Sequence, residues 1–373
     1  MTTGQDIYQM RIYIWGTGET TRELWQFFGG EVCRLNIVGY IDNRCVEGEK
    51  FKEQMVYSPD ILLTDRDAYV LIINRFYEEI RREIANKYSW YLDKILDKNF
   101  IKRLLLISRY RKVEEEEIRE FVLYLRTHPL KAISNEFLDK YERRKYPICF
   151  DDEKEMYYVY ENGKPMFFSR KIRDYESANT YYKYICAEQD LKSPHRYLVD
   201  GFEIKEGDVV VDAGVAEGNF SLNIIDKVKK IYLFEPDADW LEALRYTFEP
   251  YKDKVVIVSK ALSDFENEEY TKLDDAIPVN EQVDFIKMDI EGEEYHAILG
   301  GTRVIDQSPE LKCAICTYHQ ELAYDILKNW FNQRGFYTEP SRGYMWFDTE
   351  SDFYKVPVLR KGMIRCNKNI DSK

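Results

Sequence analysis

Residues 209–220 constrain the fold of this 373-residue chain more than any other stretch. They read Val-Val-Val-Asp-Ala-Gly-Val-Ala-Glu-Gly-Asn-Phe, so an apolar strand ends in Asp212 and a turn with Gly214 and Gly218 opens a helix. This order is typical of open α/β sheets, whose ligands bind at the carboxyl ends of the strands. We expect Gly214 to let the backbone approach a ligand and Gly218 to allow tight packing where the helix starts.

Four further apolar stretches follow at regular intervals and predict strands over residues 230–235, 255–259, 284–289 and 311–318, with helices between them. Strands that alternate with helices predict a mostly parallel sheet covered by helices on both faces. Residues 335–337 and 344–347 are predicted to form an antiparallel pair at the edge of this sheet.

Acidic residues stand where these strands end. Glu235 follows Asp212 by 23 positions, where an acid can accept both hydroxyls of a ribose. Residues 260–264 are placed to border an adenine, and Asp289 and Glu291 close the fourth strand. The spacing Gly-x-x-x-Gly differs from the Gly-x-Gly-x-x-Gly of dinucleotide proteins, whose helix N–H groups meet a pyrophosphate. An acid on this turn suits a zwitterionic, partly cationic ligand better than a diphosphate.

With these motifs, residues 196–366 resemble the FkbM-type methyltransferases, class I enzymes that methylate hydroxyl groups, often of sugars or polyketides. The most specific part is Asp-Phe-Ile-Lys-Met-Asp-Ile-Glu-Gly-Glu-Glu at 284–294, followed by Leu-Gly-Gly at 299–301. Others are 211–214 with 217–218, 234–236, 261–264 and 273–275, and together they span nearly half of the chain. At Glu217 many members of the family carry a neutral residue.

The resemblance implies S-adenosylmethionine as the cofactor. Asp212 and Gly214 would border its methionine part, Glu235 its ribose, and Leu262 and Ser263 its adenine. The predicted cofactor-binding residues are Asp212, Ala213, Gly214, Glu217, Gly218, Asn219, Glu235, Pro236, Asp237, Ala261, Leu262, Ser263 and Asp289.

Methyl transfer to a hydroxyl asks the protein to align the acceptor oxygen and to take its proton. His319, after the fifth strand, and Asp289, after the fourth, are the candidate bases. Lys287 lies two residues before Asp289 on the same strand face, so it either takes part or simply pairs with that acid. Glu291 could order the loop, bind acceptor hydroxyls or cap the next helix. Asp289 and Glu291 lack a clear metal-ligand set, and no metal is predicted.

The N-terminal residues predict a second, smaller Rossmann-like unit. A strand over residues 7–15, the turn Gly16-Thr17-Gly18, a helix from residue 19 and a strand over 36–41 give a βαβ pattern, with a further strand at 68–73. Asp42 stands at the ribose position, 24 residues after Gly18, but a third glycine is missing. This unit resembles small domains of sugar-modifying proteins. It could hold a nucleotide or nucleotide-sugar head, or serve as an empty scaffold or dimerisation domain.

The predicted division is a Rossmann-like domain over 1–97, a helical connector with a β-hairpin over 98–195, and the methyltransferase domain over 196–373. The hairpin has strands at 156–160 and 166–168 around an Asn-Gly turn, and a helix at about 175–190 follows it. The segment 193–197 could fold over the cofactor. Residues 341–344 and Arg360 could read the acceptor, although loop structure is the simpler interpretation.

Composition limits the partners. A net charge of −13 argues against a broad nucleic-acid face. The apolar runs are far shorter than the ~20 residues of a membrane span, and no signal peptide is visible. Seven cysteines, an odd number, fit a reducing compartment and a cytoplasmic protein. Cys313 and Cys316, three apart on one strand, are expected to point to opposite faces as core residues.

These features predict an S-adenosylmethionine-dependent O-methyltransferase that acts on a hydroxyl of a sugar or glycan-type acceptor, possible as a homodimer. Two alternatives stay open. One is a non-catalytic protein that binds a nucleoside or nucleotide-sugar. The other is a nicotinamide-dependent sugar oxidoreductase that uses the N-terminal unit.

Overall fold

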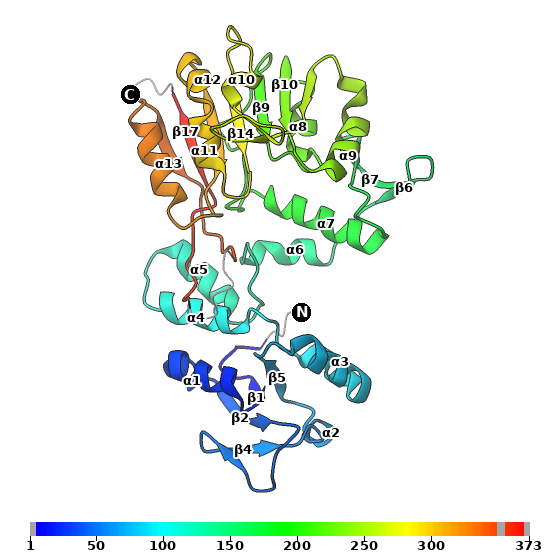
Figure 1. Ribbon diagram of the computed structural model, residues 1–373, viewed down its shortest axis with the longest axis vertical. Coiled ribbons are helices and arrows are strands. Elements are labelled where there is room, and N and C mark those ends of the chain that lie inside the picture. Colours follow the sequence, from blue (N-terminus) through cyan, green and yellow to red (C-terminus); the bar gives the residue numbers. More distant parts are fainter. Residues whose placement is uncertain (1–4, 349–354, 369–373) are drawn as a thin grey trace. The chain divides into compact units, whose positions relative to one another are not determined.

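Internal contacts divide the computed structural model, which describes residues 5–348 and 355–368, into two units (Figure 1). The first comprises residues 1–135 with 350–359, and the second comprises 136–349 with 360–373. The residues predicted as a connector, 98–195, are therefore shared: 98–135 belong to the first unit and 136–195 to the second.

The first unit is built on a five-stranded sheet of order β3-β4-β2-β1-β5, in which only β3 runs antiparallel to its neighbour. The predicted strand at 36–41 is found at those residues, whereas the strand predicted from residue 7 begins at Arg11. The elements are β1 (Arg11–Trp15), α1 (Glu19–Val32), β2 (Asn36–Ile41), β3 (Lys50–Phe51), β4 (Gln54–Tyr57), α2 (Ile61–Thr64), β5 (Tyr69–Ile72), α3 (Tyr77–Lys87), η1 (Ser89–Lys94), α4 (Phe100–Tyr110) and α5 (Glu116–Leu125).

The second unit contains the larger sheet, and all five strands predicted between residues 209 and 318 are present in it. Its elements are η2 (Glu136–Leu138), α6 (Asp139–Glu142), β6 (Cys149–Asp151), β7 (Met156–Glu161), β8 (Lys164–Phe167), α7 (Tyr175–Glu188), β9 (Val209–Ala213), α8 (Asn219–Ile224), β10 (Lys230–Phe234), α9 (Ala238–Phe248), η3 (Glu249–Tyr251), β11 (Val255–Val258), β12 (Ala261–Leu262), β13 (Tyr270–Thr271), α10 (Leu273–Ala276), β14 (Phe285–Met288), α11 (Glu294–Leu299), α12 (Thr302–Gln307), β15 (Lys312–Cys316), α13 (Ala323–Asn332), β16 (Tyr337–Pro340) and β17 (Met363–Asn367).

The large sheet has the order β11-β10-β9-β14-β15-β17-β16. The first five strands are parallel, and β17 is antiparallel to both of its neighbours. Residues of the central strands divide between two separate cores, one shared with α7, α8 and α9 and the other with α10 to α13. Figure 1 labels these helices around the sheet. Cys316 lies in the first core and Cys313 in the second, which confirms the expectation that they face opposite sides. The predicted doubly wound α/β fold is confirmed.

The edge of the sheet corrects one prediction. β16 pairs with β17, whereas residues 344–347 form no strand and only Met345 makes an isolated bridge, to Arg360. Met363, Ile364 and Cys366 are fully buried between β15 and β16, so a strand there buries more apolar surface. Residues 344–347 resemble a strand in sequence because Met345 and Trp346 are buried, but they do not join the sheet.

The predicted hairpin is present as β7 and β8, joined by Asn162 and Gly163, both with positive φ. It packs on α9, where the N–H of Phe167 donates to Thr247 Oγ1 at 2.9 Å. The following helix, α7, is capped by the Asp174 carboxylate, which accepts from the N–H of Ser177 at 2.8 Å. Among the described residues, no helix is both long and apolar enough to cross a membrane.

Candidate active site

A cavity of about 490 Å³ lies at the carboxyl ends of β9, β10 and β14, where the topology predicts a ligand. The chain after each of these strands contributes to its wall, and the loop after β15 adds the aromatic and imidazole side chains. The lining residues are Gly214, Ala216, Phe234, Glu235, Pro236, Asp237, Trp240, Ala261, Leu262, Tyr270, Asp289, Ile290, Glu291, Glu293, Tyr318, His319 and Phe347.

The glycines after β9 have different roles. Gly214 has φ of +76°, and a Cβ built on it would lie 1.8 Å from the carbonyl oxygen of Asp289. Its close approach is thus to the neighbouring strand end, although it also lines the cavity. Gly218, with φ of +84°, caps α8, and a Cβ there would lie 2.7 Å from the ring of Phe248. This agrees with the tight packing expected at the helix start.

Asp212 and Lys287 form a buried ion pair beneath this turn. Lys287 Nζ lies 3.0 Å from Asp212 Oδ1, and Ser221 Oγ donates to the other carboxylate oxygen at 2.5 Å. The ammonium group also donates to the carbonyl of Gly214. Neither charged side chain lines the cavity. Lys287 therefore pairs with Asp212 instead of Asp289, and the pair holds the turn in place.

Glu235 projects into the cavity with both carboxylate oxygens oriented by backbone. Oε2 accepts from the N–H of Ala216 and Oε1 from the N–H of Asp237, each at 2.9 Å. Burial raises the pKa of Glu235, in opposition to these two hydrogen bonds. The carboxylate is therefore fixed in orientation, with lone pairs left for a ligand.

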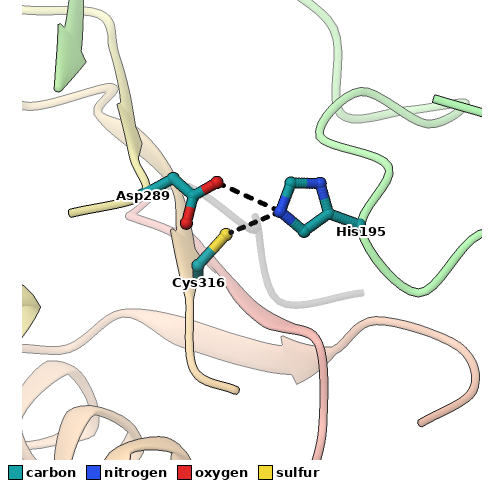
Figure 2. Close-up of side chains that lie close together, drawn as sticks. All are labelled: His195, Asp289 and Cys316. Carbon is teal, nitrogen blue, oxygen red and sulfur yellow. Dashed lines mark hydrogen bonds and ion pairs between the residues drawn. The ribbon is translucent and has the colours of Figure 1, made fainter. Parts of the chain in front are cut away.

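Asp289, directly after β14, is the most heavily hydrogen-bonded acid of the site. Its Oδ2 accepts from His195 Nε2 at 3.1 Å (Figure 2). The same oxygen accepts from the Tyr197 hydroxyl at 3.0 Å. Its Oδ1 accepts from the Tyr318 hydroxyl at 3.2 Å and lies 3.5 Å from His319 Nε2. Burial alone raises the pKa of Asp289, but the neighbouring His195 and Lys287 outweigh burial and hold it far below its usual value. A carboxylate this stabilised is a poor proton acceptor.

Figure 2 shows His195 Nε2 between Asp289 and the Cys316 thiol, whose sulfur lies 3.5 Å away. These three atoms lie close enough together to hold a metal ion, as do those of Asp289, Glu294 and His319. Burial lowers the pKa of His195, but the charges of Glu188 and Asp289 outweigh it and raise the pKa. Burial also raises the pKa of the Cys316 thiol far above its usual value. A metal at this place would have to displace the thiol proton of Cys316, which the raised pKa opposes.

His319 lies in the loop after β15 and faces the cavity, as the sequence predicts. Its Nδ1 lies 2.8 Å from Glu294 Oε1, and its ring packs edge-on against Phe347 at 5.1 Å. Arg360 holds this loop, because its Nη1 donates to the carbonyls of Tyr318 and His319, each at 2.8 Å. Arg360 thus positions the backbone of His319, a role that the sequence did not suggest.

The charge of the cavity wall is one-sided. Five carboxylates line it, and the described residues contribute neither lysine nor arginine to the lining. The carboxylates belong to Glu235, Asp237, Asp289, Glu291 and Glu293. Such a wall repels phosphate groups and attracts a cation.

The structure brings most of the predicted site residues together. Those that line the cavity are Gly214, Glu235, Pro236, Asp237, Ala261, Leu262, Asp289, Glu291 and His319. Those that do not are Asp212, Ala213, Glu217, Gly218, Asn219, Ser263 and Lys287. Glu217 is buried and accepts a hydrogen bond from the Tyr181 hydroxyl at 2.6 Å, and burial raises its pKa to about 7.

Three contacts around Asp289 and His319 were missed or undervalued. The segment 193–197 was noted as a possible cover for the cofactor, but the direct bonds of His195 and Tyr197 to Asp289 were not foreseen. Glu294 lies within the motif at 284–294 and gave no separate signal. Only its burial and its bond to His319 single it out.

Comparison with known families gives two matches. Residues 212–337 match the family described as methyltransferase FkbM domain, and residues 8–96 match one described as C2185-like, N-terminal. Comparison with curated proteins found no match.

Among solved structures, the chain is similar to a methyltransferase FkbM from Methylobacillus flagellatus KT, at 16% identity and a TM-score of 0.41, over 98% of this chain and 91% of that one. It is also similar to a Streptococcus mutans methyltransferase in complex with SAH, at 12% identity and a TM-score of 0.31. That match covers 44% of this chain and 90% of the other. A third similar structure is a precorrin-8w decarboxylase of Methanobacterium thermoautotrophicum, at 14% identity and a TM-score of 0.31. That match covers 44% of this chain and 83% of the decarboxylase.

The strand order and the ligand cavity at the β9–β14 switch point define the second unit as a class I methyltransferase fold. Within that class, residues 212–337 belong to the FkbM methyltransferase family.

Proposed function

We propose that the protein is an S-adenosylmethionine-dependent O-methyltransferase whose acceptor is a hydroxyl of a sugar or glycan. The observation that carries the proposal is the cavity with five carboxylates and, among the described residues, no basic side chain except His319. A methyl donor with a sulfonium and an ammonium group matches this charge, whereas the diphosphate of a nicotinamide cofactor opposes it.

The residues present fit a nucleoside with a cationic tail. Glu235 offers two oriented oxygens to a pair of ribose hydroxyls. Leu262 and Ile290 supply apolar surface for a base, and Gly214 lines the same cavity. When bound, S-adenosylmethionine supplies an activated methyl group, so the protein is left to place the acceptor and handle one proton.

His319 is the better candidate for the base. Asp289 holds its charge among hydrogen-bond donors, and its lowered pKa disfavours proton uptake. His319 has Glu294 at Nδ1, which orients the ring and stabilises the imidazolium once a proton is taken. Its Nε2 lies 3.5 Å from Asp289, longer than a normal hydrogen bond, so Nε2 can turn to an acceptor hydroxyl.

The choice of acceptor rests on the chemistry of the cavity wall. Glu291 and Glu293 line the same cavity as His319, and carboxylates there can accept hydrogen bonds from several hydroxyls of one molecule. Glu291 also has a φ of +57°, a conformation that is costly outside glycine and is concentrated at functional sites.

Calorimetry with S-adenosylmethionine, S-adenosylhomocysteine and NAD tests the cofactor. We expect S-adenosylmethionine and S-adenosylhomocysteine to bind, and we expect Glu235→Gln to lower the affinity for both. A methyl-label transfer screen against sugar nucleotides and glycan extracts then tests the acceptor. Binding of NAD alone, or label transfer confined to amines, would contradict the proposal.

A further inference from the structure

The first unit contains its own, larger cavity of about 750 Å³. It opens where β1, β2 and β5 end, so it occupies in this smaller sheet the place that the proposed cofactor cavity occupies in the large one. Its lining residues are Trp15, Gly16, Gly18, Glu19, Thr20, Thr21, Asp42, Asn43, Arg44, Asn74, Arg75, Phe76, Glu79, Ile80 and Glu83.

Asp42, at the end of β2, is held at the wall of this cavity by three donors. The N–H and hydroxyl of Thr17 donate to its Oδ2 at 3.3 and 3.0 Å, and the N–H of Arg44 donates to Oδ1 at 3.0 Å. The Gly16 turn that brings Thr17 there has φ of +102°. An oriented carboxylate after the second strand is the group that accepts hydrogen bonds from ribose hydroxyls in this type of sheet.

Two arginines distinguish this cavity from the other one, and they line it together with the carboxylates of Glu19, Asp42, Glu79 and Glu83. Arg44 and Arg75 are exposed and line the wall, and neither forms an ion pair with a carboxylate of the described residues. The Arg75 guanidinium lies 4.9 Å from the ring centroid of Phe76. Of the acids on α3 that face the same cavity, Glu83 is paired with Lys87 at 3.2 Å. A diphosphate therefore finds two uncommitted guanidinium groups here.

We propose that the N-terminal cavity binds a nucleoside diphosphate group, with its ribose at Asp42 and its phosphates at Arg44 and Arg75. The group could come from a free nucleotide or from a nucleotide-linked sugar, since both carry it. The cavity is large enough for the sugar of the latter, and Asn74 and Glu79 line the wall with polar groups for its hydroxyls. This inference is independent of the methyl donor proposed for the second unit.

A dinucleotide fits less well. In the Gly-x-Gly-x-x-Gly fingerprint the third glycine allows close packing between helix and strand, and here Thr21 stands at that position. Its side chain is buried, and its hydroxyl donates to the carbonyl of Gly16 at 2.8 Å. We therefore expect NAD to bind this cavity more weakly than a nucleoside diphosphate.

The test is calorimetry of the full-length protein with UDP, ADP, UDP-glucose, NAD and inorganic phosphate, in the presence and absence of saturating S-adenosylmethionine. We expect a UDP or ADP site that S-adenosylmethionine does not displace. Tighter binding of UDP-glucose than of UDP would identify a nucleotide-sugar as the source, and equal binding a free nucleotide.

Arg75→Ala should weaken nucleotide binding about tenfold, the worth of one charge-assisted hydrogen bond. Arg82→Ala, at an exposed arginine of α3 that lies outside the cavity, should leave nucleotide binding unchanged. Asp42→Asn should weaken UDP without affecting inorganic phosphate. Absence of nucleotide binding, preference for NAD, or equal affinity in Arg75→Ala and the wild type would overturn the assignment. S-adenosylmethionine binding, measured in the same samples, reports separately on the second unit.

Discussion

Glu294 Oε1 lies 2.8 Å from His319 Nδ1 and also accepts the N–H of Ile290 at 3.1 Å, so one buried carboxylate fixes both an imidazole and the loop that closes the cavity. The arrangement is that of an orienting acid behind a base. Because Glu294 does not line the cavity, it acts through His319 and not on a ligand.

Glu294→Gln should therefore lower kcat about 10- to 100-fold and leave the affinity for S-adenosylmethionine within twofold. The amide keeps the shape of the side chain but loses the charge that stabilises the imidazolium. Steady-state kinetics over pH 6–9, with Glu268→Gln as an exposed control, measures this. A merely structural role would lower thermal stability and leave the pH profile of kcat unchanged.

The two sides of the cavity should separate cleanly in mutants. His319→Ala is expected to lower kcat by roughly 10²- to 10⁴-fold, the usual contribution of a general base, with little change in the Kd of the cofactor. Glu235→Ala should instead raise that Kd at least tenfold, because two oriented hydrogen bonds to charged oxygen are lost. Equal loss of cofactor binding in both variants would refute this division.

Glu217 gives a prediction about stability. Burial raises its pKa from 4.5 to about 7, so the folded protein holds this proton more tightly than the unfolded chain. The contribution of Glu217 to folding stability is therefore greatest below pH 4.5. As pH rises from 4.5 to 7, ionisation of this group lowers the free energy of unfolding by on the order of 2–3 kcal/mol.

Glu217→Gln removes that charge and still accepts from the Tyr181 hydroxyl. Its melting temperature should exceed that of the wild type at pH 8 and converge with it near pH 5. If the difference in melting temperature between Glu217→Gln and the wild type were the same at every pH, ionisation of Glu217 would not destabilise the folded protein.

His195 has a linkage of the same sign, at a higher pH. The carboxylates of Glu188 and Asp289 outweigh burial and raise its pKa above 6.5, so its stabilising contribution is fully present below pH 6.5 and is lost as pH rises through the folded value. His195→Gln should destabilise the protein more at pH 6 than at pH 9, in denaturant titrations of both proteins. A loss of stability that does not vary with pH would mean that His195 is neutral in the folded state.

The sequence predicted what local patterns encode. Each strand from residue 209 to 318 was found because apolar runs alternate with helices, and Glu235 and His319 were placed because strand ends meet at one edge of a parallel sheet. The sequence could not show that Asp212 points away from the cavity, because its partner Lys287 is 75 residues away. From the sequence, Lys287 could have paired with Asp289 just as well as with Asp212.

Contacts between distant segments account for the other misses. His195 meets Asp289 across 94 residues and Arg360 reaches the carbonyl of His319 across 41, and neither has a spacing that a pattern can recognise. The sequence analysis assigned the last strand to residues 344–347 for a related reason. These residues and β17 are both apolar runs, and only the pairing of β17 with β15 distinguishes them.

The most direct test of the account is a diffraction structure of the protein grown with S-adenosylmethionine. We expect density in the cavity of the second unit, with the ribose hydroxyls within hydrogen-bond distance of Glu235 and the charged tail among the carboxylates. An empty cavity at saturating ligand, or a ribose bound away from Glu235, would contradict it.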